Sequence, residues 1–106
     1  MQEIFNEIKV IIEENPVVVF MKGTSSQPMC GFSSNVIQIL NILGVQLHYV
    51  DVLKDDRIRA AIKEFSKWPT IPQLYVNGVF IGGCDIVKDM YSSGELQSLL
   101  KKAELL

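Results

Sequence analysis

Val17-Val18-Val19-Phe20-Met21 is the most informative run of this 106-residue sequence. Its residues are all apolar and mostly β-branched, which predicts a central strand buried on both faces. Before it, isoleucines recur at helical spacing from Gln2 to Glu14, and Asn15-Pro16 ends that pattern. After it, a second helical pattern ends at Gly44, the expected C-terminal cap. We therefore expect a helix, a buried strand and a second helix in succession.

The remaining sequence predicts a second strand from Leu47 to Val52 and a third helix capped at its start by Asp55. Asn77-Gly78 is a strong hairpin signal, because a type I′ turn needs positive φ at both central positions. It predicts a hairpin of Gln73 to Val76 with Val79 to Ile81. Asp85 is expected to begin a fourth helix, and a leucine-rich segment follows as a fifth.

The predicted order is α-β-α-β-α-β-β-α-α. A βαβ unit implies parallel pairing through a right-handed crossover, and the hairpin adds antiparallel strands. The expected fold is therefore an α/β fold, with a mixed four-stranded sheet flanked by helices on both faces. The length leaves room for one domain, residues 1–106.

Composition excludes some classes of function. The net charge of −2 and the scattered basic residues argue against nucleic acid as a partner. No apolar run approaches the length that spans a bilayer, and the N-terminus lacks a signal or transit pattern. We expect a cytoplasmic protein, or one in an organelle matrix if the chain is a processed form. The two cysteines are too few for a disulfide scaffold.

Cys30 is the strongest candidate for chemistry. It follows a buried strand and a loop, and it lies at the expected start of a helix, where free N–H groups and the helix dipole stabilise a thiolate. Such a position lowers a cysteine pKa. Lys22, at the end of the preceding strand, is expected to add positive charge. The alternative is that Cys30 is a small buried apolar residue.

The residue three positions after Cys30 limits the chemistry. A dithiol redox motif needs a second cysteine there, and the sequence has Ser33. A mixed disulfide at Cys30 would then be resolved by an external thiol or by Cys84. The alternative role for the Cys30 thiolate is that of a metal ligand.

With these residues in view, the sequence closely resembles the monothiol glutaredoxins of the Cys-Gly-Phe-Ser type. The resemblance runs nearly end to end and rests on four segments in order: Phe20-Met21-Lys22-Gly23, Cys30-Gly31-Phe32-Ser33, Trp68-Pro69-Thr70-Ile71-Pro72-Gln73 and Gly82-Gly83-Cys84-Asp85. It implies a thioredoxin fold, glutathione binding and a [2Fe-2S] cluster. The cluster would be held between two protomers by Cys30 and one glutathione thiolate from each.

The resemblance also implies roles for individual residues. Pro72 would be a cis-proline facing the thiol, with the backbone of Ile71 free to pair with glutathione. Cys84 would be an inert thiol in the same groove, or an oxidation partner of Cys30. The full set of implied glutathione-binding residues is Lys22, Cys30, Arg59, Thr70, Ile71, Pro72, Gly83, Cys84 and Asp85. An ordinary helix cap is the alternative role for Asp85.

Three functions remain open at this point. The resemblance implies first a carrier that receives [2Fe-2S] clusters from assembly scaffolds and passes them to recipient apoproteins. The second is a glutathione-dependent oxidoreductase that removes glutathione from mixed disulfides through Cys30, with at most weak activity. The third is an iron-sensing module that shares a cluster with a BolA-type partner. A monomer is expected without the cluster, and a homodimer with it.

Overall fold

The computed structural model describes residues 1–106 as nine helices and strands in the predicted order. The elements are α1 (Gln2–Glu14), β1 (Val17–Met21), α2 (Gly31–Leu43), β2 (His48–Asp51), α3 (Asp56–Ser66), β3 (Gln73–Val76), β4 (Val79–Gly82), α4 (Cys84–Ser93) and α5 (Glu95–Lys102). No helix has the length and apolar character needed to cross a membrane.

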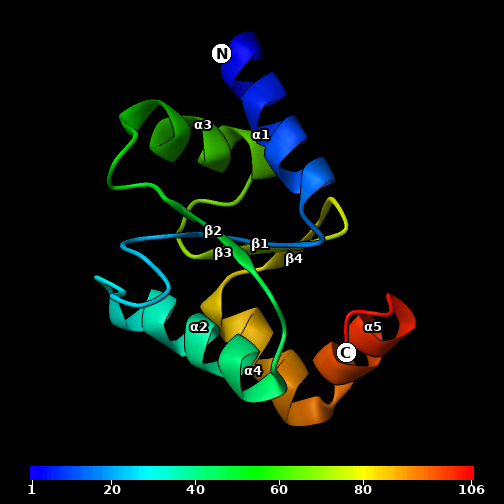
Figure 1. The fold of residues 1–106 in the computed structure, drawn as a ribbon. Coiled ribbons are helices and arrows are strands. Elements are labelled where there is room, and N and C mark those ends of the chain that lie inside the picture. The colour runs from blue at the N-terminus through cyan, green and yellow to red at the C-terminus, as the bar shows by residue number, and fades with distance from the viewer.

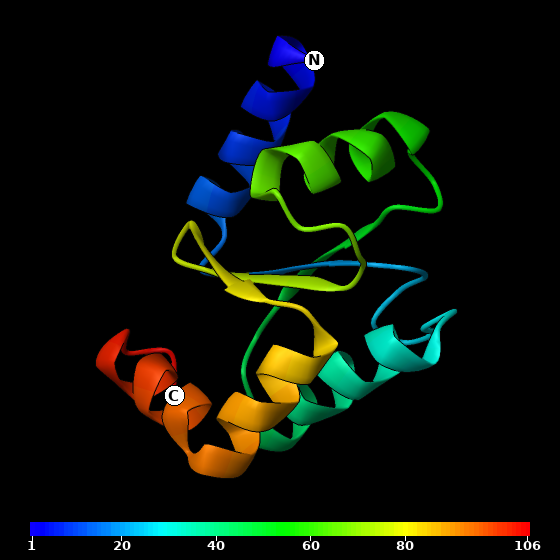
Figure 2. The same cartoon turned by 180° about the vertical axis from the view of Figure 1, so that it is seen from behind.

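The four strands form one mixed sheet in the order β2-β1-β3-β4. β1 pairs with β2 in parallel and with β3 antiparallel, and β3 pairs antiparallel with β4. Figures 1 and 2 show α1 and α3 on one side of this sheet, with α2, α4 and α5 on the other. The predicted α/β class and the three-layer arrangement are confirmed.

β1 lies at the centre of this arrangement, and all of its residues are buried. Because side chains alternate along a strand, Val17, Val19 and Met21 pack with α2 and α4. Val18 and Phe20 enter a second core with residues of α1 and α3. The strand therefore joins two cores, and its carboxyl end is held rigidly where Lys22 and the loop to Cys30 begin.

The turn and cap predictions are mostly confirmed. Asn77 and Gly78 both have positive φ, 48° and 78°, as a type I′ turn requires. Gly44 is the left-handed C-cap of α2. The side chain of Asp55 caps α3 by accepting from the N–H groups of Arg57 and Ile58.

Two boundary predictions were wrong. The second strand is shorter than Leu47 to Val52, because only His48–Asp51 pairs with β1. Asp85 is not the N-cap of α4, because Gly83 holds that position in an extended conformation and the helix begins at Cys84. The Asp85 carboxylate therefore lies in the first turn, where it complements the helix dipole.

Candidate functional site

A pocket of about 500 Å³ lies where β1, α2, β3 and α4 meet at one end of the sheet. Every predicted site residue except Arg59 lines it: Lys22, Cys30, Thr70, Ile71, Pro72, Gly83, Cys84 and Asp85. The other lining residues are Phe32, Lys63, Trp68, Pro69 and Ile86. Segments far apart in the sequence thus form one concave surface around a thiol.

Cys30 lies at the entrance to α2 as its N-cap residue and is half-exposed. The N–H of Ser33 is the largest cause that lowers the pKa of the Cys30 thiol, and burial partly opposes it. The N–H of Phe32, the positive charge of Lys22 and the Ser33 hydroxyl lower this pKa further. Backbone N–H groups therefore lower the pKa of Cys30 most, and the charge of Lys22 contributes less. The sequence predicts the same direction of the pKa shift.

Ser33 is completely buried beneath the thiol. Its Oγ accepts a hydrogen bond from the backbone N–H of Lys22 at 3.2 Å. The hydroxyl thus connects the end of β1 to the first turn of α2. It holds Lys22 and Cys30 in register, and it occupies the position that a resolving thiol would need.

Removal of the Lys22 charge tests this electrostatic account. We expect Lys22→Ala to raise the pKa of the Cys30 thiol, because a positive charge near the thiolate is lost. The pH midpoint of Cys30 alkylation should move upward yet stay below that of an unstructured cysteine peptide, since the Ser33 N–H remains. Lys63→Ala is the matched control: Lys63 lines the same pocket but does not contribute to the shifted Cys30 pKa. An unchanged midpoint in Lys22→Ala, or an equal shift in both variants, would contradict the account.

The loop between β1 and Cys30 is fixed at Gly23. One carboxylate oxygen of Asp51 accepts from the N–H groups of Gly23, at 2.9 Å, and of Leu53, at 3.0 Å. Across the loop, the N–H of Met29 donates to the carbonyl of Lys22 at 2.9 Å. These bonds close the loop just before Cys30.

The opposite wall is the loop that leads into β3. The Ile71–Pro72 peptide bond is cis, as the resemblance implies. The backbone N–H and C=O of Ile71 make no hydrogen bond within the chain. Trp68 packs against Phe80 with ring centroids 5.7 Å apart. This wall therefore presents a free backbone edge beside the thiol.

The third wall is the start of α4. A side chain at Gly83 would meet Trp68 Nε1 at 3.0 Å and the Pro72 carbonyl at 3.3 Å, so only glycine fits without displacing them. The neighbouring Cys84 is buried, with 8% of its surface exposed, and its Sγ accepts from Asn35 Nδ2 at 3.9 Å. Cys30 is thus the more accessible of the two thiols.

Charged side chains are arranged unevenly around the pocket. Lys22, Lys63 and Asp85 line it, and none of them is in an ion pair, since the salt bridges of the chain all involve Arg57. Two cations and one anion are therefore available to a ligand. The free N–H groups at the start of α4 add a further site for negative charge.

Arg59 is the one predicted site residue that the structure places outside the pocket. Lys63 follows it by four residues on α3, on the same side of the helix, and does line the pocket. The role of Arg59 in binding glutathione therefore stays a prediction, and Lys63 is a second cation on the same face of α3 that lines the pocket itself. Lys63 carries no signal in the sequence, because its position depends on how α3 packs over the sheet.

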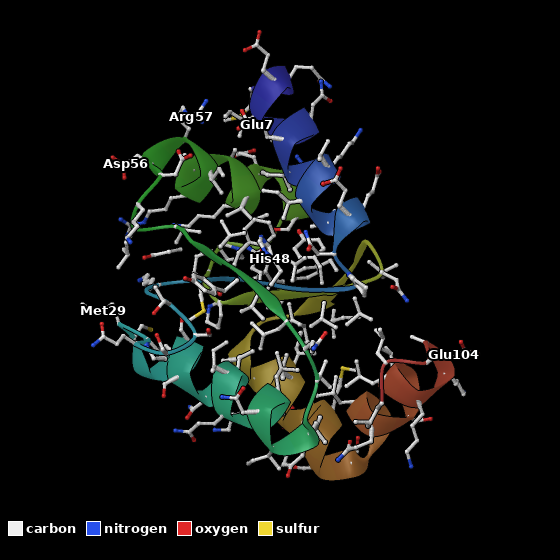
Figure 3. The ribbon with its side chains drawn as sticks, in the orientation of Figure 1. Glu7, Met29, His48, Asp56, Arg57 and Glu104 are labelled. Carbon is white, nitrogen blue, oxygen red and sulfur yellow. The ribbon has the colours of Figure 1, made fainter.

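Met29 and Phe32 flank the thiol and are unusually exposed for apolar residues, at 70% and 61%. Figure 3 shows Met29 at the outer edge of the molecule beside the start of α2. The surface around Cys30 therefore combines a thiol of lowered pKa with exposed apolar side chains. This combination is typical of a surface that contacts another molecule.

Comparisons with known proteins show which family this chain resembles. A family model described as Glutaredoxin matches residues 17–81. A monothiol glutaredoxin of Synechocystis is 56% identical over 96 residues, which cover 91% of this chain and 90% of that protein.

Two solved structures are similar over nearly the whole chain. The solution structure of a monomeric truncated mutant of 1-C-Grx1 from Trypanosoma brucei has a TM-score of 0.88 and 39% identity, covering 96% of this chain and 93% of the other. The buckwheat glutaredoxin–glutathione complex has a TM-score of 0.87 and 26% identity, covering 99% of this chain and 94% of the other.

Proposed function

This chain belongs to the glutaredoxin family, in its monothiol branch, and from that premise we propose that it carries a [2Fe-2S] cluster between proteins. In this proposal the pocket binds glutathione, and Cys30 together with the glutathione thiol supplies the cluster ligands of one protomer. The observation that carries the proposal is that Cys30 is half-exposed with a lowered pKa, while the position of a resolving cysteine is taken by the buried Ser33.

The charges of the pocket support glutathione as the ligand. Glutathione has two carboxylates and one ammonium group, and the pocket offers two unpaired lysines and one unpaired aspartate. Lys22 and Lys63 suit the carboxylates, with the start of α4 as a second anion site. Asp85 suits the ammonium group. This matching of three charges would orient the glutathione thiol toward Cys30.

The free backbone of Ile71 supports the same ligand. An extended peptide can add to an unpaired backbone edge and gain main-chain hydrogen bonds. The N–H and C=O of Ile71 lie in such an edge, on the pocket wall next to Pro72. Glutathione has a peptide unit that can pair with them while its charged ends contact the lysines and Asp85.

The donor set supports a cluster shared between chains. Iron–sulfur clusters are held by four thiolates in most proteins. The chain has no group of three or more His, Cys, Asp or Glu side chains that could hold a metal. One Cys30 and one glutathione from each of two protomers would supply four thiolates. Met29 and Phe32, exposed beside Cys30, would give the second protomer an apolar surface to contact.

Delivery of the cluster then needs ligand exchange alone. Thiolates of a recipient protein would replace Cys30 and the glutathione thiolates one after another. This exchange involves no oxidation or reduction. The half-exposed position of Cys30 favours this exchange, because an incoming thiolate can approach from solvent. Glutathione would supply two of the four thiolates, and it can leave with little change in the fold.

A glutathione-dependent oxidoreductase is the second candidate, and the lowered pKa of Cys30 favours it. Here the Cys30 thiolate attacks the glutathione sulfur of a mixed disulfide and releases the protein thiol. A second glutathione thiolate then attacks the new Cys30–glutathione disulfide, which restores Cys30 and yields oxidised glutathione. The chemistry balances without Cys84 and without a metal.

One pair of assays separates the two candidates. The protein, reconstituted anaerobically with iron, sulfide and glutathione, should transfer its cluster to an apo-ferredoxin faster than free iron and sulfide do. Its turnover of a glutathione mixed disulfide should be slow in comparison with a dithiol glutaredoxin. Rapid turnover with no cluster formed would favour the oxidoreductase and count against the carrier.

A further inference from the structure

Gln73 is a buried polar residue beneath the pocket wall, and nothing in the proposed chemistry uses it. It is the first residue of β3 and is completely buried. Its Nε2 donates two hydrogen bonds, to the carbonyl of Trp68 and to the carbonyl of Thr70, both at 3.1 Å. Both of these residues line the pocket, whereas Gln73 itself does not.

The segment from Trp68 to Pro72 has no backbone–backbone hydrogen bond of its own. Three of its polar backbone atoms are instead held by neighbouring side chains. Ser66 Oγ accepts a hydrogen bond from the N–H of Trp68 at 3.1 Å. Gln73 donates to the carbonyls of Trp68 and Thr70. Gln73 therefore anchors the middle of this loop from a buried position outside the pocket.

The chemistry of the contact requires an amide at this position. Two carbonyl oxygens face one nitrogen, and an NH₂ group has one hydrogen for each of them. A carboxylate would place negative charge against the same two oxygens, and an apolar side chain would leave both unpaired. The amide oxygen, Oε1, is buried with no partner. The two hydrogen bonds that Nε2 donates are therefore what this position requires of its side chain.

We propose that Gln73 is a positioning residue that shapes the glutathione groove by holding the loop from Trp68 to Ile71. By fixing the carbonyls on either side of Pro69, it sets the plane of the Thr70–Ile71 peptide and with it the direction of the Ile71 N–H. This inference rests on the proposed binding of glutathione. Without this anchor, the competent form of the loop becomes a fraction of the population, and the apparent affinity falls by that fraction.

Gln73→Met tests the inference, because methionine has a similar shape and no donor. Gln97→Met is the matched control: Gln97 Nε2 donates to the carbonyl of Tyr91 at 3.3 Å, and its Oε1 is also buried without a partner, but it lies on α5 outside the pocket. By calorimetric titration, glutathione should bind Gln73→Met about tenfold or more weakly than wild type. Gln97→Met should bind within about twofold of wild type, whatever its melting temperature.

Two further readouts separate positioning from a loss of folding. In the wild-type chain, NMR should show that the side-chain amide protons of Gln73 exchange more slowly than those of the exposed Gln27. In Gln73→Met, exchange should accelerate at the backbone amide of Trp68, the one amide of this loop that is hydrogen-bonded, but stay unchanged in β1. Amide protons of Gln73 as labile as those of Gln27 would overturn the inference, even if the variant failed to fold.

The outcomes also distinguish this inference from the proposed function. Wild-type protein that binds no glutathione would refute the proposed function itself. Wild-type protein that binds glutathione, with Gln73→Met binding it equally well, would refute the positioning role alone.

Discussion

Cys30→Ser should bind no [2Fe-2S] cluster and should remain a monomer after anaerobic reconstitution with glutathione. The reason is that the substitution removes the protein ligand, and the chain has no alternative group that could hold the metal. Iron and sulfide analysis, the visible absorption of the cluster and gel filtration measure the effect directly. We expect the iron content of the variant to fall to the background of a sample without protein.

The matched control is Cys84→Ser, which changes the other thiol of the same pocket. Cys84 is buried and its Sγ accepts a hydrogen bond from Asn35, so we expect it not to be a cluster ligand. This variant should keep its cluster and its dimeric state. Full iron content in Cys30→Ser, or loss of the cluster in Cys84→Ser, would mean that the ligand has been assigned to the wrong sulfur.

Gly23→Ala should cause a large loss of stability. Gly23 has a φ of +88°, and a Cβ there would lie 2.5 Å from the carbonyl oxygen of Gln27 and 2.6 Å from the nitrogen of Met29. Both are backbone atoms, so the loop itself must move. We expect a loss of about 2–5 kcal/mol in the free energy of unfolding, from the strained φ and the displaced loop together. Urea unfolding followed by circular dichroism measures it.

Gly44→Ala separates the two causes of that loss. Gly44 also has positive φ, +73°, but a Cβ there has no neighbour within 4 Å. It should therefore lose only the conformational part, about 1–2 kcal/mol. Gly23→Ala should also raise the Cys30 pKa, because the loop that carries the thiol is displaced, whereas Gly44→Ala should not. Equal losses of stability in the two variants would show that the close contact of the Gly23 position with the loop adds nothing to the cost of positive φ.

The fold was predictable because its signals are local. Val17–Met21 is apolar throughout, Asn77-Gly78 specifies its own turn, and Asp55 can cap only the helix that follows it. Asp85 misled the prediction for the same reason. An aspartate near a helix start is a good cap, but here Gly83 is the N-cap and the helix already begins at Cys84, so Asp85 lies inside the first turn.

The site was predictable where it rests on sequence motifs and not where it rests on packing. Lys22 and Cys30 lie next to a strand end and a helix start, so their chemistry follows from their neighbours in the chain. Lys63 enters the pocket only because of the way α3 lies over the sheet. The burial of Gln73 is likewise tertiary, because its two partners belong to a loop whose path no local pattern fixes.

The central claim is that Cys30 must share its cluster with glutathione and with a second chain. Native mass spectrometry of the anaerobically reconstituted protein measures this composition in one spectrum. We predict a species with two chains, one [2Fe-2S] cluster and two glutathione molecules, which disappears when glutathione is omitted. A cluster bound to a single chain, or a clustered dimer that forms without glutathione, would contradict the account.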